Sequence, residues 1–388
     1  MRGTHDTPDE HSPRTPGAHA DRTTGHDNGV PHRLSHMRND LMRPVYHPAG
    51  GDDDLRVAMV ELQAGRWRAA RNLLLATSSR GLRTSRTQVL AVAAAGADVV
   101  DVWLAEEPDA YDPQVMRARV FVERALRAHR QQHTGVAEFE TRARHAAQMA
   151  AQRAPQDPVP WVCLLALAQV DRHQRRPEHR VRSAEPMLPP GPWQLLDEVV
   201  RRDPYNREAY HRVLQFLLSR NAPPSAQLAS VFDFGRWVAS WAPAGTPMLL
   251  LPAYAQVEQC RLQRADGRVH PLWRRQWAEE PMHSYSLDAF HGWFKKADPA
   301  MRSLTDLNYL AYALWAGHQY LEAAAVFTAM EPYATREPWA SLEERPPGPN
   351  GGQELMLRAR RESLAYANSH APPASPRQGP VGHTSRLA

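Results

Sequence analysis

The sequence predicts an all-α protein, an irregular array of antiparallel helix hairpins, and two observations carry most of that prediction. Between residues 52 and 370 the apolar residues recur at three- and four-residue steps, the period of a helix, and the alternation typical of strands is almost absent. The second observation is a set of Asp-Pro pairs, in which the Asp can cap a helix and the Pro suits its first turn. These pairs begin at Asp112, Asp157, Asp203 and Asp298.

The helices expected from this period, in chain order, lie near residues 53–64, 67–78, 86–94, 97–105, 113–131, 137–153, 158–171, 192–202, 206–219, 225–241, 247–263, 285–296, 304–316, 319–330 and 353–368. The segments between them are mostly short, so consecutive helices are expected to pack antiparallel. They define a helical repeat domain over residues 49–342, a linker at 343–352 and a C-terminal helix at 353–370. An unrelated helical bundle is the alternative architecture.

Residues 1–48 and 371–388 are expected to be disordered tails. The first has almost no large apolar side chains, so it cannot bury enough surface to offset the entropy lost on ordering. The second is rich in Pro. Seven histidines fall in the first tail, and their irregular spacing favours a solvated tail over a loose metal site. They are His5, His11, His19, His26, His32, His36 and His47.

Two segments, 304–330 and 55–77, share a hairpin layout. In each, a small residue in the first helix precedes a Gly turn, an aromatic residue and a second small residue. These are Ala311, Gly317, Tyr320 and Ala323 in one segment, and Ala58, Gly65, Trp67 and Ala70 in the other. Small residues let two helices approach closely, while the aromatic ring fills the wider space beside the turn.

Two further stretches place an aromatic residue six positions after a Pro and ahead of an apolar run. These are Pro155 and Trp161 in "APQDPVPWVCLLALA", and Pro204 and Tyr210 in "RRDPYNREAYHRVLQFLL". The pattern resembles the tetratricopeptide repeat, whose hairpins close with a Pro before the next unit opens with a large apolar residue. The resemblance implies an α-solenoid in which these residues form the junctions between hairpins. The two prolines lie 49 residues apart, so the array is irregular. The layout also resembles uncharacterised actinobacterial proteins, which imply no activity.

Composition argues against several classes of function. Lys and Arg number 47 against 42 Asp and Glu, and this near-neutral balance makes a nucleic-acid binder unlikely. Cys163 and Cys260 lie in apolar runs without metal-ligand spacing, so both are expected to be core residues and no metal or other cofactor is predicted. No apolar signal segment opens the chain, and the longest apolar run is too short to cross a bilayer. A cytoplasmic protein with no membrane partner is the default expectation.

Three local patterns admit a functional interpretation beside a structural one. Asp288 and His291 lie three apart on an expected helix, where a carboxylate could orient an imidazole for base catalysis. No nucleophile elbow, phosphate loop or zinc-ligand pair accompanies them, which favours a surface hydrogen bond. The segment 266–281 interleaves Arg with Trp273 and Trp277, and is expected to be a mobile loop or surface helix with two docking tryptophans rather than a base-stacking site. The basic run 174–182 is expected to be a solvated loop.

The leading functional hypothesis is a non-catalytic scaffold that binds a protein or peptide of unknown identity on a concave surface formed by the first helices of stacked hairpins. The residues expected to face that surface are Glu208, His211, Gln215, Asn308 and Tyr312. They lack the paired Lys and Asn with which tetratricopeptide units clamp a peptide carboxylate. The alternatives are an enzyme or small-molecule binder with a pocket near Asp288 and His291, and a nucleic-acid binder.

Overall fold

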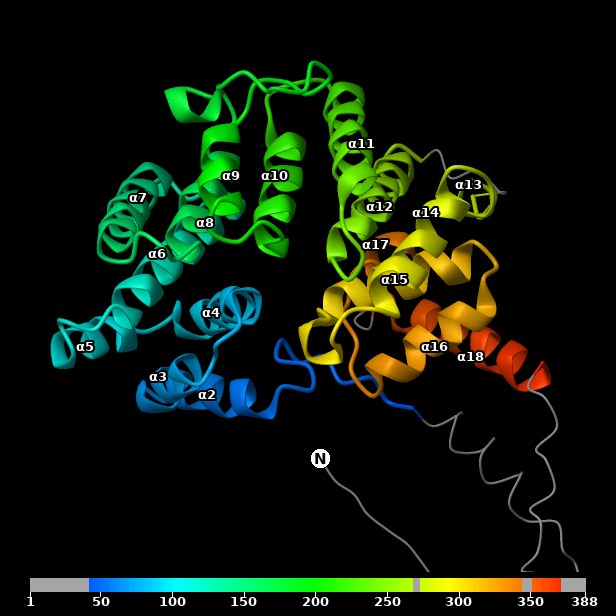
Figure 1. Ribbon diagram of the computed structural model, residues 1–388, viewed down its shortest axis with the longest axis horizontal. Helices are drawn as coiled ribbons and strands as arrows, with labels where there is room; N and C mark the ends of the chain where they lie inside the picture. Colours follow the sequence, from blue (N-terminus) through cyan, green and yellow to red (C-terminus); the bar gives the residue numbers. More distant parts are fainter. Residues whose placement is uncertain (1–41, 268–272, 344–350, 371–388) are drawn as a thin grey trace, which may run out of the picture. The chain divides into compact units, whose positions relative to one another are not determined.

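The computed structural model describes residues 42–267, 273–343 and 351–370, and the described residues from Arg43 onward belong to one compact unit. Within these ranges 68% of the residues are helical and no strand is present (Figure 1). The prediction of an all-α protein is therefore confirmed for the described part of the chain. The expectations for residues 1–41 and 371–388 and for most of the linker lie outside it.

The α-helices, in chain order, are α2 (Asp53–Gln63), α3 (Arg68–Leu75), α4 (Arg80–Ala94), α5 (Val99–Glu106), α6 (Asp112–Arg130), α7 (Val136–Arg153), α8 (Val159–Ala166), α9 (Trp193–Val200), α10 (Arg207–Ser219), α11 (Pro224–Trp241), α12 (Leu251–Ala265), α13 (Arg275–Ala278), α14 (Met282–Asp288), α15 (Leu304–Ala316), α16 (Tyr320–Met330), α17 (Trp339–Leu342) and α18 (Gln353–Ser369). Short 3-10 turns lie at Leu167–Gln169, Pro177–His179, Pro247–Leu250 and Pro299–Met301, and a π-helix lies at Ala289–Phe294. No single helix in the described ranges is long and apolar enough to cross a membrane. Helices α4 and α5, whose axes meet at a 115° bend, are together long and apolar enough by length and composition alone.

Several boundaries differ from those expected. Helix α4 begins six residues before the expected start at 86, because the Ser79 hydroxyl accepts from the Leu82 amide and caps the helix at that point. The expected helix 158–171 ends at Ala166 and tightens into a 3-10 turn. The expected helix 285–296 changes from α14 to a π-helix within its length. The four-residue helices α13 and α17 are too short to leave a period in the sequence.

Consecutive helices pack against each other as hairpin neighbours, and a second set of contacts skips one helix. The first set includes α2 with α3, α6 with α7, α10 with α11, and α15 with α16. The second set links α2 with α4, α4 with α6, α6 with α8, and α8 with α10. Helices α4 and α10, well separated along the chain, also touch. This contact is what brings distant residues to one site.

Two clusters of buried apolar side chains form the core. One draws its members from Ala49 to Ala255, and the other from Leu250 to Ala359. Tryptophans fill much of both, and those almost wholly buried are Trp103, Trp277, Trp293, Trp315 and Trp339. Trp277, expected to be a docking tryptophan of a loop or surface helix, is fully buried, and its ring packs edge-on against Tyr312 at 5.4 Å in the second cluster. Its neighbour Trp273 is half-buried against the same cluster.

The two Pro–aromatic stretches are held by different contacts. The Tyr210 hydroxyl donates to the Pro204 carbonyl at 3.0 Å, so the six-residue spacing lets the ring close back on the turn. A Trp has no hydroxyl to make this bond. At the other stretch Arg202 donates to the Pro155 carbonyl instead, and its guanidinium lies 4.7 Å from the centre of the half-buried Trp161 ring.

The segment before α2 lies against residues far along the chain. The Val45 amide donates to the Pro332 carbonyl at 2.9 Å, and the Ala334 amide donates to the Val45 carbonyl at 3.1 Å. Arg56 donates to both the Gly50 carbonyl and the Tyr333 hydroxyl. Residues 43–48 were expected to belong to a disordered tail, but these hydrogen bonds attach them to the helical body. A short segment with few apolar residues gains order here from backbone pairing, which composition does not reveal.

Candidate functional site

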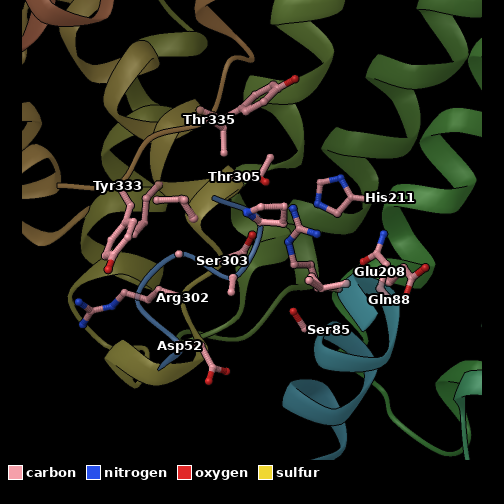
Figure 2. A pocket seen from close by; sticks show the side chains of 18 of the residues that line it. Asp52, Ser85, Gln88, Glu208, His211, Arg302, Ser303, Thr305, Tyr333 and Thr335 are labelled. Atoms are coloured by element: carbon pink, nitrogen blue, oxygen red, sulfur yellow. The ribbon is translucent and has the colours of Figure 1, made fainter. Parts of the chain in front are cut away.

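A cavity of about 880 Å³ is bordered by seven parts of the chain. Its walls come from residues 47–55, from α4, from α10, from α11, from α12, from residues 299–309 and from residues 329–335. Figure 2 shows Gln88 of α4 next to Glu208 of α10, with His211 above them, Ser85 below, and Tyr333 and Arg302 on the opposite side. A volume of this size is typical of ligand-binding clefts in proteins.

Helix α10 presents a stripe of side chains to the cavity. Arg207, His211, Gln215 and Leu218 recur at steps of three or four residues and therefore share one helix face. Asn206 fixes where this helix begins, because its side-chain oxygen accepts from the Ala209 amide at 3.1 Å. Glu208, His211 and Gln215, which were expected from the sequence to share one helix face, all line the cavity.

Helix α4 presents a second stripe, which sequence reasoning missed. Ser85, Gln88, Val89 and Val92 lie at helical steps and all line the cavity. The expected helix 86–94 contains Gln88, Val89 and Val92 but leaves out Ser85, and no function was assigned to this face from the sequence. The signal that could have found it is the cap at Ser79, since starting the helix there places Ser85 one turn before Val89.

Glu208 is held between two arginines below the cavity surface. Its carboxylate oxygen accepts from Arg119 of α6 and from Arg212 of α10, each at 2.8 Å. The Glu208 and Arg119 side chains are 5% and 3% exposed. Burial alone raises the pKa of Glu208, but the charges and hydrogen bonds of the two arginines outweigh burial and hold that pKa below its usual value. Glu208 is therefore a buried ion-pair residue, and the accessibility expected of it is wrong.

A second charged network joins α10, α12 and α15. Arg207 donates to the Asp306 carboxylate at 2.7 Å, and the Tyr254 hydroxyl donates to the same oxygen at 2.6 Å. The Asp306 side chain is fully buried. Burial would raise the pKa of Asp306, but the charge of Arg207 keeps it below the usual range. The carboxylate thus remains ionised and ties the two apolar clusters together.

His211 lies beside this second network and is neutral. Its ring is edge-on to Tyr254 at 4.5 Å, and its Nε2 is 3.8 Å from Asp306 Oδ1. Burial and the charge of Arg207 lower the pKa of His211 to about 3, against the opposing effect of Asp306. A base in catalysis at neutral pH needs a pKa near the operating pH, so this imidazole is a poor proton acceptor.

The remaining charged side chains that line the cavity also have partners. Asp52 accepts from Arg86 at 2.9 Å, Glu258 accepts from Arg261 at 2.7 Å, Glu331 accepts from Arg360 at 2.7 Å, and Arg302 donates to the Ala297 carbonyl at 2.8 Å. Four arginines and four carboxylates border the cavity, so its formal charge is balanced. The formal charges of the lining residues therefore sum to zero.

The uncharged polar side chains behave differently. Ser85, Gln88, Ser303 and Thr305 line the cavity and make no side-chain hydrogen bond among the described residues. Gln215 is exposed, and its side-chain oxygen accepts from Arg212 at 3.2 Å while its amide nitrogen has no protein acceptor in the described ranges. Val92 is 45% exposed beside them. The cavity thus offers free uncharged donors and acceptors next to apolar surface.

Two of the five predicted surface residues lie in the core. Asn308 is fully buried and accepts from the Trp339 indole at 2.9 Å, while Tyr312 is fully buried among Trp rings. The prediction that they face an accessible surface is wrong. Helix α15 is covered on every side in the second cluster, so its apolar period could not indicate which face is open.

The alternative site at Asp288 and His291 does not form in the described structure. Both side chains are exposed, no hydrogen bond joins them, and neither lines the cavity. The change to a π-helix at Ala289 alters the rotation per residue between the two positions. The proposed dyad therefore has no geometric support.

Other candidate groups are already engaged. Cys163 and Cys260 are buried, as expected, and burial raises the pKa of the Cys163 thiol to about 12. In the basic run 174–182, Arg176 pairs with Glu140 and His179 is fully buried against Asp171, so the run is partly docked rather than solvated. No group of three His, Cys, Asp or Glu side chains in the described ranges is placed to hold a metal.

Comparisons with protein-family models, with curated proteins and with solved structures give no match for this chain. The functional argument therefore depends on the residues of the cavity and their contacts.

Proposed function

We propose that the protein is a non-catalytic binding protein whose cavity holds a segment of another polypeptide. The observation that carries the proposal is the pair of side-chain stripes on α4 and α10, which border one cavity with uncharged polar and apolar groups. From Arg207 to Leu218 a helix rises roughly 16 Å, a length spanned by about five residues of extended chain. The site is thus long enough for a short peptide segment.

The finer architecture belongs to the same proposal. We read α2, α4, α6, α8 and α10 as the first helices of successive tetratricopeptide-like hairpins, because each packs against the next-but-one helix. First helices in such an array border a common surface. The stripes on α4 and α10 both face the cavity, which supports this assignment.

The two other functions expected from sequence have less support. An enzyme needs a reactive group at the cavity, and His211 is held neutral by its low pKa while the Cys163 thiol is buried. A nucleic-acid binder needs cations that are free to meet phosphates. The arginines that line the cavity each have a protein partner.

The proposal is tested with peptides selected from a random-sequence display library on the full-length chain. Gln88→Ala combined with Gln215→Ala removes two amide groups from the facing stripes and should weaken the affinity of the selected peptides at least tenfold, roughly the effect of one or two lost hydrogen bonds. The matched control is Gln148→Ala with Gln152→Ala, two exposed glutamines one turn apart on α7 that do not line the cavity.

The control pair should bind the peptides as the natural sequence does. Equal affinities for all three proteins would place binding outside the cavity and contradict the proposal. Melting curves of the two double variants exclude unfolding as the reason for a loss.

A further inference from the structure

We propose that the cavity binds an uncharged, extended polypeptide segment with an apolar side chain at every second position. This inference rests on the function proposed above and names the chemistry of its ligand. It draws on the charge pairing in the cavity, on the free polar groups, on the exposed apolar side chains and on a segment of the chain itself that borders the site.

The charge pairing disfavours a ligand that needs an ion pair. A charged ligand group would have to compete for Arg207, Arg212 or Arg86, each of which already donates to a carboxylate. The fourth arginine of the lining, Arg302, donates to the Ala297 carbonyl and lies over the Phe294 ring. Separating Arg207 from Asp306 would leave a fully buried carboxylate without its cation. The free-energy cost of leaving that carboxylate unpaired exceeds the free energy gained from a new ion pair at the cavity surface. A net charge on the ligand is therefore expected to weaken its binding.

The free polar groups match a peptide main chain. Each residue of a peptide carries one N–H donor and one C=O acceptor, and both need partners when they leave water. Hydroxyl groups and carboxamides both donate and accept, so Ser85, Gln88, Ser303 and Thr305 can meet either group. Gln215 adds a free amide donor on the facing stripe. These partners do not depend on ligand sequence.

The exposed apolar side chains of the cavity favour a ligand with apolar side chains. Val89 and Val92 of α4 and Leu218 of α10 all retain exposed surface at the cavity. In an extended chain alternate side chains point to the same side, so residues at i and i+2 can meet this wall together. Each apolar side chain covered in this way gains hydrophobic free energy without disturbing a charged pair.

An uncharged segment of the chain itself borders the cavity, where it forms a turn rather than an extended strand. Residues 47–51 line one wall and read His-Pro-Ala-Gly-Gly, with no acidic or basic side chain apart from a histidine. Just before them, the Val45 amide and carbonyl pair with main-chain groups of Pro332 and Ala334. A segment without an acidic or basic side chain other than His47 thus lies at the cavity wall, next to a main-chain pairing that lies outside the lining.

Selection of peptides from the random display library on the full-length chain tests the inference, with the double variant of Gln88 and Gln215 as counter-selection. Peptides that depend on the cavity should lack charged residues and carry apolar residues at alternate positions. Their Kd should change less than about twofold between roughly 50 mM and 500 mM salt, because screening acts on charges. A Lys or Asp in place of one apolar residue should weaken binding at least tenfold.

Cavity-dependent peptides that share a charged residue and lose affinity with salt would overturn this inference and leave the proposed function intact. Peptides that bind equally well to the double variant would overturn the proposed function and this inference with it. The two failures are therefore distinguishable in one experiment.

Discussion

Glu208 illustrates what a helical pattern can and cannot establish about one residue. It lines the cavity together with His211 and Gln215, with which it was expected to share a face. Its burial depends on Arg119, which is 89 positions away and belongs to another helix. A single sequence contains no signal for that pairing, so a residue expected to be exposed proved to be the centre of an ion-pair network.

Replacing Glu208 should therefore affect stability rather than binding alone. Glu208→Ala leaves Arg119 and Arg212 buried without their carboxylate and should lower the free energy of unfolding by about 3 to 5 kcal/mol. Gln215→Ala, on the same stripe but exposed, should change it by less than about 0.5 kcal/mol. Urea unfolding of the two variants measures both values. Similar small changes would show that the Glu208 network contributes little to the fold.

The low pKa of His211 predicts that the folded protein loses stability in acid. Between the usual pKa of about 6.5 and the folded value of about 3, the unfolded chain binds a proton at this ring and the folded chain does not, so stability falls as the pH drops through that window. At pH 5 the loss amounts to roughly 2 kcal/mol. Arg207, Arg212, Asp306 and Glu208 surround the ring and stay charged throughout most of this range.

His211→Gln removes this titration and retains a polar side chain. Its free energy of unfolding should therefore fall less between pH 7 and pH 5 than that of the natural sequence, by about 2 kcal/mol. Titrations shared by both proteins, such as that of the buried His179, cancel in the comparison. Parallel pH profiles for the two proteins would contradict the assignment.

At the scale of elements, long periodic helices were predictable and their ends were not. The period identified α6, α7, α10 and α11 to within a few residues, because each buries one face. The start of α4 depended on a single hydroxyl at Ser79, and the π-helix at Ala289–Phe294 on local packing. The expected helix 86–94 therefore left out Ser85, one of the four residues that α4 presents to the cavity.

The start of α10 can be tested through its cap. Asn206 is 1% exposed, caps the Ala209 amide and donates to Thr84 of α4 at 3.2 Å, so it joins the two helices whose stripes border the cavity. Asn206→Ala should lower the free energy of unfolding by about 1 to 2 kcal/mol. Asp298→Ala, which removes an exposed cap from a 3-10 turn, should cost less than about 0.5 kcal/mol. Chemical denaturation measures the free energy of unfolding of both variants. Equal decreases would show that the hydrogen bond from Asn206 to α4 does not contribute to stability.

For the molecule as a whole, the sequence predicted helices and hairpin neighbours but not the cavity. Its walls combine the segment before α2 with residues near 330, two regions at opposite ends of the described chain. Contacts over such separations follow from how the hairpins pack, and no local period encodes them. The apparent concave residues Asn308 and Tyr312 were assigned by analogy between hairpins, which fails where α15 is enclosed by the second apolar cluster.

Protection of a cysteine in the cavity tests the central claim, that a polypeptide segment binds there, most directly. Both native cysteines are buried, so Ser85→Cys provides one reactive thiol at the cavity and Ser284→Cys provides a matched exposed thiol on α14, outside the residues that line it. A saturating concentration of a peptide selected on the full-length chain should slow alkylation of Cys at 85 at least tenfold, since an occupied site excludes the reagent, and should leave the thiol at 284 unchanged. Equal alkylation rates at 85 with and without the peptide would contradict the account.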